Sequence, residues 1–472
     1  MNSRLKSLIT NSGYAIFSNL LSMLISALVV LVLPKVVGVA SYGYWQLYLF
    51  YVSYVGFFHF GWIDGIYLKY GGQYYEKLDK SKFFSQFIVY TIFQAVLGGI
   101  IYLYGLLFVA DVEKQFIWSM LAITLLLTNM RYFVIYILQT TNRIKESSLI
   151  TISDRLLYAF LLLGFVFLGT SNYRVMIYAD VVGRVISLLY GLYLCKEIFF
   201  AKDNHFYLDI KEIFDNIRVG SNLMLSNVAS MLIIGTVRLG IERGWDIETF
   251  GKLSLTLSIS NLLMVFINAV GIVIFPMLKR LDPKKLPQLY IALRNFLMIA
   301  MLAVLLVYYP LQYILNIWLP SYRESLTFMV LVFPMAVYES KMSLLINTYL
   351  KALRMERYIL KVNLITVGIS VILTVLTTVV FKQLELAVTS IIILLSLRAL
   401  MAELTVARKL KIDVNKDIIL ENIMVLVFVT AGWFLSGLSA LVVYVVVYLT
   451  YVVLKKNDLF ESIKNMKILL DN

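Results

Sequence analysis

Two stretches of the chain nearly repeat each other: residues 18–25 read S-N-L-L-S-M-L-I, and residues 226–233 read S-N-V-A-S-M-L-I. The shift between them is 208 residues, and the same shift carries S-Y-G at 41–43 onto T-F-G at 249–251. Each copy lies in an apolar run long enough to cross a lipid bilayer. A duplicated membrane bundle is a common plan for carriers that expose a central site first to one side of the membrane and then to the other.

Composition places the chain in the membrane. Apolar residues make up 61% of its 472 residues and its mean hydropathy is +0.84, whereas soluble domains contain roughly 45–50% apolar residues. The sequence therefore predicts an all-α integral membrane protein. We count about fourteen segments of spanning length, at residues 12–33, 43–67, 84–108, 116–138, 149–169, 175–196, 218–237, 252–276, 290–310, 326–349, 359–380, 386–406, 418–435 and 438–454.

The order of these segments predicts two six-helix bundles. Six segments precede a gap near 197–217, and an even number returns the chain to its starting side, so both copies begin on the same side. We expect an N-terminal bundle at 1–200, a cytoplasmic and amphipathic linker at 201–217, a C-terminal bundle at 218–408, and an extra helix pair with a cytoplasmic tail at 409–472. The two bundles are then related by a pseudo-two-fold axis along the membrane normal.

The formal net charge of +14 follows from topology. With Arg4 and Lys6 in the cytoplasm, most of the remaining Lys and Arg residues fall in loops on that side, as the positive-inside rule expects. We therefore expect both termini in the cytoplasm and no binding to nucleic acid.

Four arginines fall inside predicted spans: Arg131, Arg155, Arg184 and Arg398. Each lies roughly 7–12 residues from a cytoplasmic helix end, which is about 10–18 Å along a helix. Charges at that depth are costly and usually face a cavity or a partner. The guanidinium fork suits phosphate, so the four arginines, together with Lys341, predict a basic cavity for a diphosphate. The alternatives are snorkelling of Arg131 to the lipid headgroups and a simple helical pair of Asp180 with Arg184.

Carboxylates also fall in or near the spans: Asp64, Asp154, Asp180, Glu339 and Glu403. An intramembrane carboxylate can carry a proton or sodium ion and couple transport to a gradient. The alternative is that these groups balance the nearby arginines or Lys341. Glu339 is the deeper coupling candidate, and Asp64 lies near a helix end.

Residues for catalysis are missing from the sequence. His59 and His205 are the two histidines and neither has metal-ligand spacing around it; no phosphate-binding loop of the G-x-x-x-x-G-K type is found. We expect no metal, no cofactor and no catalytic residue, which favours a transporter over an enzyme.

These features resemble the polysaccharide-biosynthesis flippases, the O-antigen flippase family of the multidrug/oligosaccharidyl-lipid/polysaccharide (MOP) exporter superfamily. The likeness rests on P-K-V-V-G-V-A-S-Y-G at 34–43, G-W-I-D-G-I-Y-L-K-Y at 61–70 and L-Q-T-T-N-R-I-K at 138–145. It continues through R-V-G-S-N-L-M-L-S at 218–226, where the family usually has a proline and this chain has none.

The resemblance implies a MATE-like, V-shaped pair of bundles that opens inward and outward in turn. It implies transfer of a polyprenyl-diphosphate-linked oligosaccharide, an undecaprenyl-diphosphate glycan, across the bacterial plasma (inner) membrane. Besides membrane lipid, a polysaccharide polymerase and chain-length proteins are the expected partners. Two other functions stay open: a cation-coupled multidrug or metabolite antiporter of the same fold, and a membrane polysaccharide polymerase or ligase.

Overall fold

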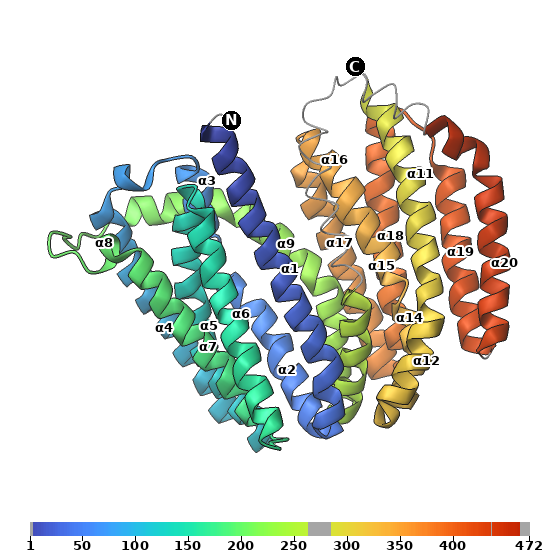
Figure 1. The fold of residues 1–472 in the computed structure, drawn as a ribbon, viewed down its shortest axis with the longest axis horizontal. Coiled ribbons are helices and arrows are strands. Elements are labelled where there is room, and N and C mark those ends of the chain that lie inside the picture. The colour runs from blue at the N-terminus through green and yellow to red at the C-terminus, as the bar shows by residue number, and fades with distance from the viewer. Residues whose placement is uncertain (1–2, 263–284, 436, 463–472) are drawn as a thin grey trace. The chain divides into compact units, whose positions relative to one another are not determined.

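The computed structural model describes residues 3–262, 285–435 and 437–462 (Figure 1). Within these ranges the chain forms helices and turns and no β-strand. It divides into two compact units, Met1–Val228 (unit 1) and Ala229–Asn472 (unit 2). The division falls inside one long helix, α9 (Ile210–Gly244), which therefore contributes to both units.

Unit 1 consists of long apolar helices joined by short turns. Its elements are α1 (Ser3–Val36), α2 (Val39–Val55), η1 (Gly56–His59), α3 (Trp62–Tyr70), η2 (Tyr75–Lys77), α4 (Lys80–Phe108), α5 (Val112–Thr140), α6 (Ile144–Phe167), α7 (Tyr173–Leu194), α8 (Lys196–Phe199) and the first half of α9. The helix α5 is central, because it packs against α2, α3, α4, α6 and α7.

Polar residues begin three of these helices. Asp79 accepts a backbone hydrogen bond at the start of α4, Asp111 does so at the start of α5, and Asn172 does so at the start of α7. Such caps satisfy amide groups that have no partner within the helix. Between the caps, α4 exposes an apolar stripe of Ile92, Val96 and Ile100 at four-residue spacing, which is the pattern of a surface that faces lipid.

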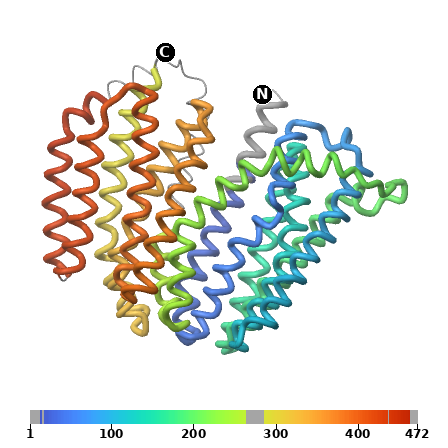
Figure 2. The backbone as a smooth tube through the Cα atoms, turned by 180° about the vertical axis from the view of Figure 1, so that it is seen from behind, coloured from blue at the N-terminus to red at the C-terminus, as the bar shows by residue number. Residues whose placement is uncertain are grey.

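Unit 2 contains more interrupted helices. After α9, residues 247–262 are helical. There follow α11 (Leu286–Val304), η4 (Leu305–Val307), α12 (Tyr308–Trp318), η5 (Pro320–Tyr322), α13 (Arg323–Thr327), α14 (Met329–Val332), α15 (Met335–Ser340), the π-helical η6 (Lys341–Ile346), α16 (Asn347–Ala352), α17 (Glu356–Thr374), the π-helical η7 (Val375–Val380), α18 (Leu384–Leu410), α19 (Asn415–Phe434) and α20 (Leu438–Leu454). The pair α19 and α20 lies side by side at one edge of the unit (Figure 2).

The expected all-α membrane fold is confirmed. The described residues contain eleven helices that are long and apolar enough to span a bilayer, and α20 with its bent continuation Lys456–Ser462 makes a twelfth. The second expected segment, 43–67, is divided into α2 and α3, because Phe60 and Gly61 adopt the left-handed region with φ of 51° and 87°. Residues 263–276 of the eighth expected segment lie outside the described residues. The chain is thus a multi-pass membrane protein.

The expected amphipathic linker at 201–217 is helical only in its second half. Residues 201–209 are not helical, and residues 210–217 form the first two turns of α9. Two side chains hold this end of α9 against unit 1: Glu212 accepts hydrogen bonds from Lys69 and Tyr70, and Asn216 donates one to Gln86. The charged residues at 211–215 therefore form the first turns of α9.

Glycines allow α3 and α9 to touch at the backbone. A Cβ atom at Gly65 would lie 1.9 Å from the carbonyl oxygen of Asn216, and one at Gly220 would lie 2.0 Å from the carbonyl oxygen of Gly61. Small residues at such crossings are the usual way in which membrane helices approach closely. The contact fixes the break between α2 and α3 against α9.

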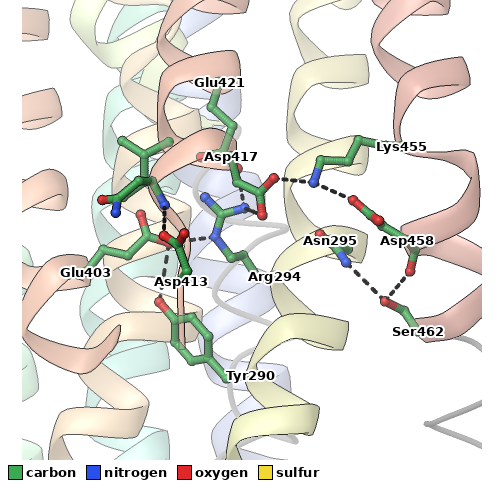
Figure 3. A network of polar contacts seen from close by, with 12 residues as sticks. Tyr290, Arg294, Asn295, Glu403, Asp413, Asp417, Glu421, Lys455, Asp458 and Ser462 are labelled. Carbon is green, nitrogen blue, oxygen red and sulfur yellow. Dashed lines mark hydrogen bonds and ion pairs between the residues drawn. The ribbon is translucent and has the colours of Figure 1, made fainter. Parts of the chain in front are cut away.

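A buried network of ion pairs binds the extra helix pair to the rest of unit 2 (Figure 3). Arg294 on α11 lies 2.7 Å from Glu403 on α18 and 2.8 Å from Glu421 on α19. Lys341 pairs with the same two carboxylates. Asp417 on α19 pairs with Arg294 and with Lys455, which follows α20. The charges thus join α11, η6, α18, α19 and the end of α20.

We predict that Gly65→Ala destabilises unit 1. The added methyl group overlaps the α9 backbone, and overpacking of this kind costs about 1–3 kcal/mol. Thermal unfolding of the purified protein in detergent measures the loss. Gly99→Ala on the exposed face of α4 is the control, because a Cβ there meets nothing within 4 Å. Equal melting temperatures for the two variants would contradict the close crossing of α3 and α9.

We predict that Glu421→Gln loosens the extra helix pair. The change leaves Arg294 and Lys341 with one fewer carboxylate in a buried site, and breaking a buried pair costs about 3–5 kcal/mol. Limited proteolysis between α18 and α19 should become faster. Glu385→Gln, at the exposed start of α18, should leave the cleavage rate unchanged. A cleavage rate for Glu421→Gln that matches the parent chain would show that the network does not hold the pair.

Candidate functional site

Three of the predicted arginines lie in the interiors of neighbouring helices of unit 1: Arg131 on α5, Arg155 on α6 and Arg184 on α7. The helices α6 and α7 approach closely at Gly183, where a Cβ atom would lie 3.3 Å from the backbone oxygen of Asp154. This close packing brings Asp154 and the guanidinium groups from three helices into one polar region inside an apolar bundle.

Arg184 is held by its own helix and by two others. Its Nε donates to Asp180 at 2.8 Å, one helical turn away, and its Nη1 donates to the hydroxyl of Thr128 on α5 at 2.8 Å. The hydroxyl of Tyr48 on α2 donates to the same carboxylate at 2.7 Å and contacts Thr124 at 2.9 Å. The helical pair of Asp180 with Arg184, one of the alternatives open from the sequence, is therefore present.

Arg131 and Arg155 share one carboxylate. Nη1 of Arg131 donates to Oδ2 of Asp154 at 2.9 Å, and both side chains are almost fully buried. Nε of Arg155 lies 4.0 Å from the same oxygen, and 37% of the Arg155 side chain is exposed. We refer to Arg131, Asp154, Arg155, Asp180 and Arg184 as the unit 1 cluster. It contains three cations and two carboxylates.

Arg398 lies in unit 2, in a separate group. Its Nη1 donates to Glu339 at 2.9 Å, its Nε donates to Asn363 at 2.9 Å, and its Nη2 donates to Ser230 at 2.7 Å. Ser230 is part of the second copy of the repeated sequence, so the repeat supplies one ligand of this arginine. Glu339 is the most exposed member of the ion pair, with 23% of its side chain accessible.

Lys341 does not join Arg398. It is the first residue of the π-helical η6 and pairs with Glu403 and Glu421 in the network that holds the extra helix pair. Its buried charge is therefore matched by two carboxylates. Asp64, the remaining coupling candidate, lies buried on α3, where one oxygen is 3.7 Å from Nε2 of His59.

The ion-pair network of unit 2 includes three residues that the sequence did not predict as functional: Arg294, Asp417 and Glu421. Arg294 and Glu421 lie within four residues of the ends of the predicted spans at 290–310 and 418–435, and Asp417 lies just outside the second span, so their positions do not mark them as intramembrane charges. Their spacing gives no local signal, because the partners lie on different helices. Only the contact between α11 and α19 brings them together.

The single cysteine has no reactive setting. Cys195 follows α7 and is fully buried, and burial raises the pKa of its thiol to about 11. A thiol with that pKa stays protonated at neutral pH and is a poor nucleophile. Among the described residues, no group of three or more His, Cys, Asp or Glu side chains is placed to hold a metal ion.

Comparisons with known proteins agree with this architecture. The family described as "Polysaccharide biosynthesis protein" matches residues 8–282, more than half of the chain. Sequence search finds no match among curated proteins.

Solved structures of transporters share the fold. An inward-facing multidrug resistance MATE family transporter of the MOP superfamily has a TM-score of 0.62 at 13% identity, covering 83% of this chain and 98% of that one. The lipid II flippase MurJ, in an inward closed conformation, has a TM-score of 0.58 at 14% identity, covering 95% of this chain and 99% of that one. A MATE in a straight conformation has a TM-score of 0.55 at 14% identity over 86% of this chain and 96% of that one. The resemblance stated from the sequence is confirmed: the chain has the fold of the MOP exporters and belongs to the polysaccharide biosynthesis protein family.

Proposed function

We propose that this protein is a flippase that moves a polyprenyl-diphosphate-linked oligosaccharide from the cytoplasmic to the outer leaflet of the bacterial plasma membrane. The N-terminal bundle (1–200) and the C-terminal bundle (218–408) would expose the site to each side in turn, with both chain ends in the cytoplasm. The family supports a role in polysaccharide biosynthesis, and the shared fold is that of membrane transporters and of a lipid flippase.

The observation that carries the proposal is the excess of positive charge in the unit 1 cluster. Arg131 takes the near position on Asp154, and Arg184 occupies Asp180. Arg155 is left 4.0 Å from a carboxylate that already has a closer partner. Its side chain is partly exposed, and among the described residues no hydrogen bond from its guanidinium group is found. This guanidinium is therefore available to an anion.

A diphosphate matches that vacancy in charge and shape. The planar guanidinium group can hold two phosphate oxygens at once, and an anion of the substrate would balance the third cation of the cluster. Below the headgroup, the prenyl tail needs only apolar surroundings, which the bilayer supplies. The cluster binds the diphosphate and not the sugars, so it recognises the part of the substrate that is common to many lipid-linked glycans.

The other candidates receive graded roles in this proposal. Arg131 and Arg184 contribute to the positive electrostatic potential of the site. They also hold Asp154 and Asp180 in place. Arg398 contacts the diphosphate only if the anion displaces Glu339, and a displaced Glu339 would be free to take up a proton or sodium ion. Lys341 and Asp64 lie in other contacts, so we assign them structural roles. The antiporter alternative requires a free acidic site. Asp154, Asp180 and Glu339 are each bound to an arginine, which leaves Asp64, 3.7 Å from Nε2 of His59, as the one remaining acidic candidate from the sequence.

We predict that Arg155→Gln abolishes surface glycan in a strain that depends on this gene, while the protein still reaches the membrane. The variant removes the available cation and leaves the pairs of Arg131 and Arg184 intact. Arg155→Lys should keep part of the activity, since an ammonium retains the charge but not the fork. Immunoblotting of membranes and labelling of the surface glycan give the two measurements.

Arg174→Gln is the matched control for this experiment. Arg174 also lies on unit 1, its side chain is also 37% exposed, and it pairs with Glu113 at the start of α5, away from the cluster. It should retain surface glycan. Normal glycan in the Arg155→Gln strain would remove the diphosphate from the unit 1 cluster.

A further inference from the structure

A cavity of about 590 Å³ opens between α9 and α17 with η7 at the end of unit 2 where α9 stops. Its volume falls in the range of small-ligand sites, about 300–1,000 Å³. Two cations from different elements line it: Arg243 in the last turn of α9, and Lys382 just after η7. No carboxylate is among the described residues that line the cavity.

Both cations are exposed and available. In the described part of the chain neither one forms an ion pair, although other charged residues of unit 2 do. A basic residue at a helix C-terminus is favourable with respect to the helix dipole, which accounts for one such residue on each helix. It does not account for two cations that share one hollow without an acidic partner.

The helices that line the cavity approach each other closely at Thr374. Thr374 is 6% exposed, lines the cavity, and its hydroxyl has no hydrogen-bond partner among the described residues. The helices meet here because α9 presents Gly240, where a Cβ atom would lie 2.3 Å from the methyl group of Thr374. The hydroxyl oxygen itself is buried, so it does not face the cavity.

An apolar track leads away from the cations along α17 and η7. Val371, Val375 and Val379 all line the cavity, and their side chains are exposed by 47%, 48% and 62%. Four-residue spacing places them on one side of the helix. The cavity therefore has a cationic end at the surface and an apolar wall that runs toward the membrane interior. A lipid with a phosphate headgroup has the same arrangement, with a charged end and an apolar chain.

We propose that this cavity binds the phosphate group of a lipid, with Arg243 and Lys382 on the phosphate oxygens and the hydrocarbon chain along Val371, Val375 and Val379. With the termini in the cytoplasm, the cavity lies at the outer leaflet. It rests on the proposed function only for the source of the lipid, which is either the prenyl diphosphate of the substrate or a phospholipid of the membrane.

Photocrosslinking tests the site in the purified full-length chain in detergent. A benzophenone amino acid replaces Val375, the probe is sugar-free polyprenyl diphosphate, and the crosslinked fraction is measured by mass spectrometry. Arg243→Gln/Lys382→Gln should lower capture about tenfold, because two charge-assisted contacts are lost. The matched control, Arg357→Gln/Lys361→Gln, removes two exposed charges from the other end of α17 and should capture as the parent does. Equal capture by both double variants overturns the proposal.

Competition identifies the source of the lipid. If phosphatidylglycerol at equal concentration displaces the probe, the site belongs to membrane phospholipid. If unlabelled prenyl diphosphate displaces the probe and phosphatidylglycerol does not, the site belongs to the substrate. Either result supports a site for a lipid phosphate. Inorganic pyrophosphate that displaces the probe equally well overturns the role of the apolar track. Binding is measured without transport, so the outcome is independent of whether Arg155→Gln still flips glycan. The altered residues are exposed, and an unchanged melting temperature of the double variant confirms that loss of capture is not unfolding.

Discussion

The cost of burying a guanidinium group among apolar helices governs the polar structure of both units. A charge in that setting is stable only if carboxylates and hydroxyls surround it, and Arg131, Arg184, Arg294 and Arg398 all have such partners. Each partner comes from a defined helix, so the ion pairs also fix which helices lie together. The cations that fall outside this rule, Arg155 above all, are those that the fold does not need for its own stability.

Hydropathy predicts where the helices lie because each bilayer-spanning segment must be apolar along its length. It does not predict where one stops being straight. The run at 43–67 is continuously apolar, yet it turns at Phe60 and Gly61, and the reason lies in a distant segment: the α3 backbone must fit against Asn216 and Gly220 of α9. The same contact holds the first turns of α9 against α3. Tertiary fit decided both features, and local sequence carries no record of it.

The candidate site was predictable in its residues and only partly in its pairs. Asp180 with Arg184 follows from four-residue spacing on one helix. The closer partner of Asp154 does not: the adjacent Arg155 lies 4.0 Å from its carboxylate, whereas Arg131 from another helix lies 2.9 Å from it. Depth along the helices predicts that Lys341 and Arg398 share one basic cavity, but the two residues belong to different groups of ion pairs. The direction of a side chain around its helix decides which residues it contacts, and Lys341 begins a π-helical turn, η6.

The two cationic sites differ in a way that suits directional movement of an anion. Arg155 lies beside the buried carboxylate of Asp154 with 37% of its side chain exposed, so an anion bound there is partly shielded from water and the attraction between charges is stronger than at an open surface. Arg243 and Lys382 are exposed at a helix end, where water and salt weaken the same attraction. In the proposed function, a diphosphate therefore binds more strongly to Arg155 than to Arg243 and Lys382. If the lipid in the cavity of unit 2 is the substrate, strong binding at both places would trap it on the outer side, and weak binding by Arg243 and Lys382 would let it leave.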